Sequence, residues 1–278
     1  MARHSTYPRS VYQRVLGWAG LLVVLLIVAF LILPAVVVTI AAFNDKAILS
    51  FPPQGWSWRW FARALAYEDF RQGFFNGLIV TAWSSTIALC VGAMFAFVID
   101  RYRFPLKTVI EGVLVSPLVI PHFTVGLGFL ILAAQIGWSR GFAVVVVCHV
   151  ILVLPFVLRS TYVSLKNLDQ SYELAASSLG ATPLRVLLTI TVPLLVPGLV
   201  SGWLFAAILS FNEFTASLFV TSQHTQTLPV AMYNYVREFA DPSMAALSVM
   251  YIVGTAALIA FANSFMGLGK VLNIEQPH

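Results

Sequence analysis

The side chains of this chain that could do chemistry gather in two short segments of an otherwise apolar sequence. One is Phe211-Asn212-Glu213, within the apolar stretch 194–220, and the other is residues 172–198, which read YELAASSLGATPLRVLLTITVPLLVPG. A carboxylate is costly inside a bilayer, so Glu213 should face a cavity or a neighbouring protein. There it could attract a cation, such as an amine, or hydrogen-bond the neighbouring protein.

Other kinds of chemistry find little support. The metalloprotease motif HExxH is absent, and Cys90 and Cys148 lie in separate apolar runs without metal-ligand spacing. His122 and His149 each stand alone, with no carboxylate in helical register, which disfavours a proton relay and favours histidines that lie in the core or line a pathway. The phosphate-binding pattern GxxxxGK[ST] is absent as well, so any ATP must be hydrolysed by another protein. The sequence therefore does not indicate an enzyme.

The composition is that of a membrane protein. Of the 278 residues, 59% are hydrophobic and only 10% are charged, and the mean hydropathy is +0.88. A soluble domain would carry roughly 25% charged residues. Apolar runs that reach the about 20 residues of a bilayer-spanning helix recur along the whole length, which leaves no room for a separate soluble domain. The net charge is +5, but the basic residues are spread over loops and do not form the basic face typical of a nucleic-acid-binding protein. Their distribution instead indicates the membrane topology.

The predicted fold class is all-α, a polytopic membrane bundle of six transmembrane helices at 16–43, 77–99, 110–136, 141–158, 194–220 and 244–267. The first is too long for the core of a signal peptide and is expected to be retained. With the N-terminus inside, ten of the 16 Lys and Arg residues fall on the cytoplasmic side. The positive-inside rule then predicts that both termini and a loop of about 159–192 are cytoplasmic.

Two interruptions of the apolar pattern predict irregular backbone. The third span contains SPLVIPHFTVGLG (116–128), whose two prolines predict a bent helix packed against other helices, with a helix that lines a substrate route as the alternative. The outer loop contains FPPQGWSWRWF (51–61), whose prolines and glycine oppose a helix. The three tryptophans of this loop suit the interface between membrane and water, so we expect the loop to lie at the outer membrane surface.

The cytoplasmic loop is predicted to hold two short helices joined at a glycine. Asp169 can cap the first helix, and Gly180 can supply the left-handed residue that ends it. Thr182 and Pro183 then read as the cap and first residue of a second helix, which continues to Ile190. The first helix, of about ten residues and roughly 15 Å, is too short to span a membrane.

Small side chains give the first of these helices a slim surface. Ala175, Ala176, Ser177 and Ser178 follow one another along it, so the backbone of another protein could approach closely. The alternative is a surface loop that lies in the inner headgroup region. The two interpretations differ in whether a partner protein binds here.

The loop resembles the EAA loop of binding-protein-dependent ABC importer permeases, whose pattern is Glu-Ala-Ala, three residues, Gly, nine residues, Ile, any residue, Leu-Pro. Here Ala175-Ala176 precede Gly180 at the family spacing, and Ile190 and Val192-Pro193 close the pattern. Leu174 stands at the usual Glu position, with Glu173 one residue earlier. The resemblance implies a coupling helix for an ATPase, formed by Glu173, Ala175, Ala176, Ser177, Gly180, Thr182 and Pro183.

Three further segments resemble the spermidine/putrescine-type permease subunit: FPPQGWSWRWF, SFNEFTASLFVT (210–221) and TLPVAMYNYV (227–236). The resemblance implies a single transmembrane permease domain over 1–278, with the type I importer fold, which forms half of a translocation pathway in the bacterial inner membrane. The expected solute is a polyamine. An aminophosphonate, another organic amine or ferric ion are alternatives within the same family. Phe211, Asn212 and Glu213 are the expected substrate-pathway residues, with contact to a second permease subunit as the alternative for Glu213.

The same resemblance also implies which partners the chain has. A cytoplasmic ABC ATPase dimer, a second permease subunit and an external solute-binding protein are expected, without nucleic acid. No cofactor or metal of the chain's own is expected, because ATP and magnesium would be used by the ATPase.

An ion-driven secondary transporter is the competing transport hypothesis. Such carriers usually have matched inverted halves with midplane charges, whereas the two halves of this sequence do not match. A scaffold without transport activity would leave the pattern of the cytoplasmic loop unexplained.

Overall fold

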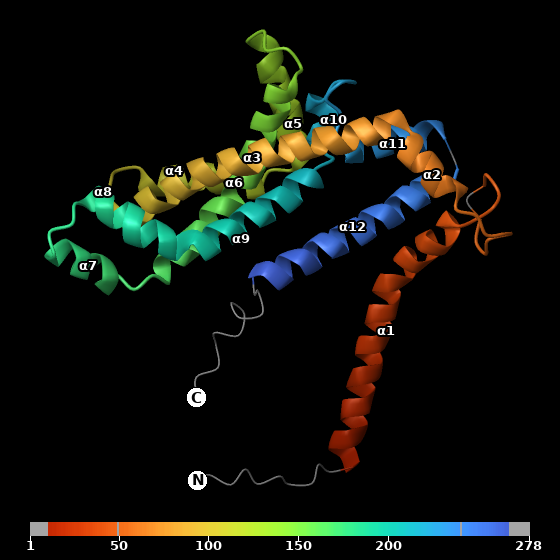
Figure 1. Ribbon diagram of the computed structural model, residues 1–278, viewed down its shortest axis with the longest axis horizontal. Coiled ribbons are helices and arrows are strands. Elements are labelled where there is room, and N and C mark those ends of the chain that lie inside the picture. Colours follow the sequence, from red (N-terminus) through yellow and green to blue (C-terminus); the bar gives the residue numbers. More distant parts are fainter. Residues whose placement is uncertain (1–10, 49, 240, 267–278) are drawn as a thin grey trace. The chain divides into compact units, whose positions relative to one another are not determined.

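The computed structural model describes residues 11–48, 50–239 and 241–266 (Figure 1). These residues are helical or irregular, and their only extended pairing is an isolated bridge between Asn44 and Trp56. The all-α class is therefore confirmed. The chain divides into two units, one of residues 67–235 and one of residues 1–66 with 236–278.

Three long helices form the body of the unit 67–235: α3 (Glu68–Arg101), α6 (Phe142–Lys166) and α9 (Val192–Phe211). They lie side by side along their length (Figure 1). Small residues let the backbones approach closely, as is common between helices in membranes. At Gly92 of α3, an added Cβ would lie 3.1 Å from Cγ1 of Val157 on α6.

The segment between α3 and α6 is sharply bent, as its prolines predicted. It consists of α4 (Lys107–Val115), a 3₁₀ turn (Ser116–Leu118) and α5 (His122–Gln135), with an angle of 107° between the two parts. Proline has no N–H to donate and clashes with the preceding helical turn, so Pro117 and Pro121 break the helix here. The bend places His122 at the first position of α5.

Short helices flank α9 at both ends (Figure 1). Before it come α7 (Ser171–Ser178), α8 (Pro183–Val186) and a π-helical turn (Leu187–Thr191) that runs directly into α9. After it come α10 (Ser217–Val220) and α11 (Leu228–Glu238). In the view of Figure 1, α7 and α8 lie at one end of the three long helices, and α10 lies toward the other.

The described part of the second unit contains α1 (Val11–Ala42), α2 (Arg59–Ala66) and α12 (Ser243–Met266). Ala42, Trp60, Ala245 and Ala246 are buried together in its core. Residues 51–58, before α2, are irregular, as the prolines predicted, whereas residues 59–61 of the same segment already belong to α2, and the three tryptophans of the segment are not alike. Trp56 and Trp58 are exposed, whereas Trp60 is buried and donates its indole N–H to the carbonyl of Asn44 at 2.6 Å.

The predicted span boundaries need several corrections. The helix that contains the predicted fourth span, 141–158, extends to Lys166. The fifth runs from Pro183 to Phe211, so it starts earlier and ends earlier than the predicted 194–220. Periodicity could not fix these ends because they depend on tertiary contacts and on a π turn that joins two helices into one.

Four helices of the described residues are long and apolar enough to cross a membrane, and the bent pair α4–α5 would be a fifth. The described apolar part of α12, Ser243–Ala257, is shorter. A count of six transmembrane helices therefore stays a prediction.

Gly126 of α5 offers a direct test of the packing in the unit 67–235. An added Cβ would lie 2.7 Å from Cα and 2.8 Å from the carbonyl oxygen of Ala216, and backbone atoms cannot move aside cheaply. We expect Gly126→Ala to reduce stability by about 1–3 kcal/mol and to lower the melting midpoint of the purified protein. Gly128→Ala, in the same helix and with no atom within 4 Å of the added Cβ, is the matched control. Equal melting of the two variants would contradict the packing of α5 against Ala216.

Candidate functional site

The turn between α7 and α8 has the geometry that the sequence predicted. Gly180 has a φ of +84°, in the left-handed region that favours glycine. Its N–H donates to the carbonyl of Ser177 at 3.0 Å, and the N–H of Ala181 donates to the carbonyl of Ala176 at 3.1 Å. These two bonds form a Schellman motif, which satisfies carbonyls at the end of α7.

Both helices of this pair also begin as predicted. The hydroxyl of Thr182 accepts the N–H of Arg185 at 3.4 Å, and Pro183 is the first residue of α8. The carboxylate of Asp169 accepts the N–H of Ser171 at 2.9 Å, and this bond lowers the pKa of Asp169 below its usual 3.8. Because the folded-state pKa is lowered, the bond stabilises the folded state above pH 3.8 and is lost only as the pH falls through the lowered value.

The exposed face of the α7–α8 pair consists mainly of small and apolar side chains. Ser177 and Ser178 donate their hydroxyls to carbonyls four residues back, at 2.9 Å each, so the hydroxyls lie against the helix. Ala175 is exposed beside them. Around this slim surface, Leu174 is 67% exposed, Leu179 is 89% exposed and Leu184 is 64% exposed. Exposed leucines next to small residues are typical of a protein-binding surface.

Glu173 does not share that face. Its carboxylate is 17% exposed and lies 2.7 Å from Nη2 of Arg101, at the end of α3. The hydroxyl of Thr191 donates to the same carboxylate at 2.6 Å. The sequence pattern placed Glu173 with Ala175 and Ala176, whereas the structure turns its side chain toward the long helices.

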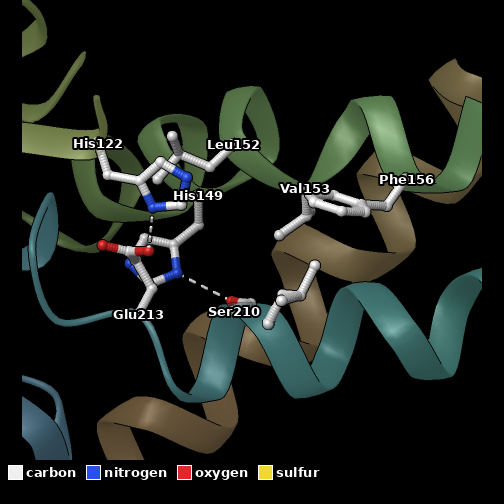
Figure 2. A pocket seen from close by; sticks show the side chains of 8 residues that line it. His122, His149, Leu152, Val153, Phe156, Ser210 and Glu213 are labelled. Atoms are coloured by element: carbon white, nitrogen blue, oxygen red, sulfur yellow. Dashed lines mark hydrogen bonds and ion pairs between the residues drawn. The ribbon is translucent and has the colours of Figure 1, made fainter. Parts of the chain in front are cut away.

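A second candidate site is a small pocket, with a cavity volume of about 40 Å³, between α5, α6 and the end of α9 (Figure 2). Its lining residues are His122, His149, Leu152, Val153, Phe156, Leu209, Ser210 and Glu213. In Figure 2 the two histidines and Glu213 form a polar group, and Val153 and Phe156 contribute apolar surface. Mostly apolar walls with a few convergent polar groups are also the usual lining of a small-molecule site, although such sites have volumes of roughly 300 Å³ or more and this cavity is much smaller.

Glu213 is the charged group of this pocket. Its Oε2 lies 2.7 Å from Nδ1 of His122, and its Oε1 accepts the N–H of Ala216 at 2.8 Å. The carboxylate is 10% exposed and the histidine 42%. Sequence reasoning missed this pair because it searched for a carboxylate in helical register with His122, whereas the partner lies 91 residues away.

The position predicted for Glu213 needs correction, since it was placed inside the fifth span. Helix α9 ends at Phe211, and Glu213 lies in the irregular segment between α9 and α10. Irregular backbone is tolerated at membrane depth where it is buried in protein or lines a cavity. The break turns the carboxylate into the pocket, and its own backbone carbonyl accepts the hydroxyl of Ser217 at 2.8 Å.

His149 holds the polar side of the pocket together. It is fully buried on α6, with Nδ1 2.8 Å from the hydroxyl of Ser210 and Nε2 2.8 Å from the hydroxyl of Ser217. Ser210 in turn lies 2.9 Å from the hydroxyl of Ser84 on α3. The network therefore connects α3, α6 and both sides of the break that carries Glu213. His149 could be found in the sequence only as an isolated polar residue in an apolar run.

Of the three residues predicted for the substrate pathway, only Glu213 lines the pocket. The side-chain amide of Asn212 donates to the carbonyl of Ile208 at 2.7 Å. The ring of Phe211 packs edge-on to Phe74 with 5.9 Å between centroids. Neighbours in sequence thus face different surroundings because the helix ends between them.

One match to the hydrolase pattern GxSxG, residues 137–141 (GWSRG), does not form a nucleophile elbow. Such an elbow joins a strand to a helix. Here Ser139 is exposed in the turn between α5 and α6. The pattern therefore carries no catalytic site.

Comparison with known proteins decides the family. Residues 88–268 match the family described as "Binding-protein-dependent transport system inner membrane component". The chain belongs to this family. It is a permease subunit of an ABC importer, and the resemblance of residues 172–193 to the EAA loop is confirmed at the level of the family.

Two relatives extend the match over most of the chain. The putrescine transport system permease protein PotI of Escherichia coli (strain K12) is 32% identical over 248 residues, which are 87% of this chain and 88% of the relative. The spermidine/putrescine transport system permease protein PotC of Haemophilus influenzae is 29% identical over 235 residues, 84% of this chain and 91% of the relative.

Solved structures share the fold at low sequence identity. A permease chain of a bacterial ABC transporter involved in the import of the acidic polysaccharide alginate has a TM-score of 0.72 at 14% identity. The alignment covers 94% of this chain and 99% of that chain. The methionine ABC transporter MetNI, in an inward-facing conformation, gives 0.59 at 18% identity, over 71% of this chain and 94% of that chain.

Proposed function

We propose that this permease forms half of the translocation pathway for a small organic cation, and that the cation is a polyamine of the putrescine or spermidine type. The pocket carboxylate of Glu213 is the observation that carries the proposal. A carboxylate in a largely apolar pocket favours an ammonium group, and the ring of Phe156, which also lines the pocket, suits the methylene chain of such a solute. The names of the polyamine permease relatives support the same solute class.

The chemistry of the pocket weighs against two other solutes. The molybdenum transport system permease protein ModB of Haemophilus influenzae is 35% identical over 173 residues, but these are 56% of this chain. An anionic solute would be repelled by Glu213. Ferric ion would need several hard ligands, and in the described part of the chain no three His, Cys, Asp or Glu side chains gather to hold a metal.

The α7–α8 pair supplies the proposed connection to the energy source. Its slim apolar surface, with Leu174, Leu179 and Leu184 exposed, suits a groove on a cytoplasmic ABC ATPase. The role of Ala175, Ala176, Ser177, Gly180, Thr182 and Pro183 as coupling residues is part of this proposal. Closure of an ATPase dimer would then displace the pair, and the long helices would shift with it.

The remaining partners and the orientation follow from the same proposal. A second six-span permease subunit would complete the pathway, and a periplasmic or extracellular solute-binding protein would deliver the solute to the outer loops. Both termini would be cytoplasmic, as the distribution of Lys and Arg favours. ATP and magnesium would be bound by the ATPase and not by this chain.

Uptake by the reconstituted complex tests the proposal. The permease subunits, their ATPase and their binding protein are placed in proteoliposomes and supplied with radiolabelled putrescine. We expect uptake that requires internal ATP and the binding protein, and that vanadate abolishes. Alginate oligosaccharide, molybdate and ferric citrate serve as control solutes. Uptake driven by an ion gradient without ATP, or a clear preference for one of the control solutes, would refute the proposal.

A further inference from the structure

We infer that Glu173 is a positioning residue, which fastens α7 to the long helices through Arg101 and Thr191 and does not contact the ATPase. The inference rests on the proposed role of the α7–α8 pair as the segment that docks on the ATPase. It assigns to Glu173 a contact within the permease, in place of the contact with a partner that the sequence pattern suggested.

The carboxylate of Glu173 is held from two sides. Nη2 of Arg101 donates to Oε1 at 2.8 Å and lies 2.7 Å from Oε2, and Thr191 donates its hydroxyl to Oε1 at 2.6 Å. Arg101 is 19% exposed and Glu173 is 17% exposed, while Thr191 is 1% exposed. A charge-assisted bond shielded from water in this way is stronger and less mobile than a surface ion pair.

The network continues beyond Arg101. Nε of Arg101 lies 3.5 Å from Asp100, whose carboxylate is 3% exposed, and Nζ of Lys166 lies 2.8 Å from the other oxygen of Asp100. Four alternating charges therefore join the end of α3, the end of α6 and the first turn of α7. The helix dipoles favour this arrangement, because Arg101 ends α3 and Glu173 begins α7.

Little else holds α7 in place. None of its residues, Ser171–Ser178, is buried. A helix with so little packing would swing about its chain connections when a partner pushes on it. The bonds of Glu173 oppose this swing, so that a displacement of α7 is passed to α3 and, through Thr191, to the helix that continues into α9. The π turn that ends at Thr191 is a further sign of function, since such turns are frequent at functional sites.

The effect of Glu173→Gln on coupling tests the inference. We expect the variant complex to assemble with the ATPase as the unmodified complex does, because the exposed face of α7 is unchanged. Putrescine uptake should fall about fivefold or more, within the usual range of coupling between sites, and more ATP should be hydrolysed for each putrescine transported. Glu111→Gln, which removes a carboxylate from α4, is the matched control and should behave as the unmodified complex.

A covalent link between positions 173 and 101, in place of the ion pair, gives a second test that remains valid if Glu173→Gln fails to fold. In the double variant Glu173→Cys/Arg101→Cys, putrescine uptake should be low while the two cysteines are not linked. Uptake should recover when a short bifunctional thiol reagent joins them. Failure of the joined variant to recover would overturn the inference. Unchanged uptake in Glu173→Gln would overturn it as well, and so would loss of the ATPase from that variant, which would show a contact with the partner.

Leu179→Asp separates this inference from the proposed function. A charge on the exposed face of the α7–α8 pair should release the ATPase. If Leu179→Asp retains the ATPase and full uptake, the proposed docking surface is wrong. If Leu179→Asp releases the ATPase while Glu173→Gln is fully coupled, the docking surface stands and the role inferred for Glu173 fails.

Discussion

Glu213→Gln is expected to lower putrescine uptake by roughly 10- to 100-fold, because a charged hydrogen bond contributes about 1.5–3 kcal/mol. Glutamine keeps the size of the side chain and can still accept the N–H of Ala216, which now lies 2.8 Å from Oε1. It cannot provide the negative charge that attracts an ammonium group. Uptake at several putrescine concentrations measures the effect.

Two controls make this prediction specific. Asn212→Ala changes the adjacent side chain, which bonds the carbonyl of Ile208 outside the pocket, and should keep most of the uptake. Glu213→Asp keeps the charge on a shorter side chain. Its putrescine uptake should lie between that of Glu213→Gln and that of the unmodified protein. If Glu213 instead joins two permease subunits, Glu213→Gln would separate them during purification. Normal uptake by Glu213→Gln would exclude a role of the carboxylate in transport.

Gly180→Val is expected to abolish most uptake while ATP hydrolysis continues without coupling. With φ at +84°, a β-branched residue at this position costs about 1–2 kcal/mol or more and disturbs the Schellman motif that sets the angle between α7 and α8. The strain is in the backbone alone, since no atom lies within 4 Å of an added Cβ. The ratio of ATP hydrolysed to putrescine transported is the measurement that reveals uncoupling.

Gly180→Asn is the matched variant for this position. Asparagine tolerates the left-handed conformation far better than valine, so it should retain much of the coupled transport although its side chain is as large. A similar loss in both variants would point to a need for an empty space at residue 180, for example against the ATPase. Uptake at the normal rate in Gly180→Val would show that the angle of the turn does not matter.

The two candidate sites differ in how far local chemistry determines them. The turn at Gly180 is set by a few adjacent residues whose preferences agree: small residues, then glycine, then a threonine cap and a proline. The pocket is set by three separate elements, α5, α6 and the break after α9, and none of them reveals the others in its own sequence. For this reason the backbone geometry of the turn between α7 and α8 could be predicted, although the direction of the Glu173 side chain could not, while only one of the three expected pathway residues lies in the pocket.

The sequence by itself determined the membrane class, the all-α architecture, the bend at Pro117 and Pro121, and the helix–glycine–helix geometry of 169–190, because each follows from hydropathy or from backbone preferences of neighbouring residues. Only the tertiary structure decided that Glu213 pairs with His122 and that Glu173 pairs with Arg101, 91 and 72 residues apart. Such pairs form when packed helices bring distant side chains together. That packing depends on close approaches such as Gly92 to Val157, which no pattern along a single helix specifies.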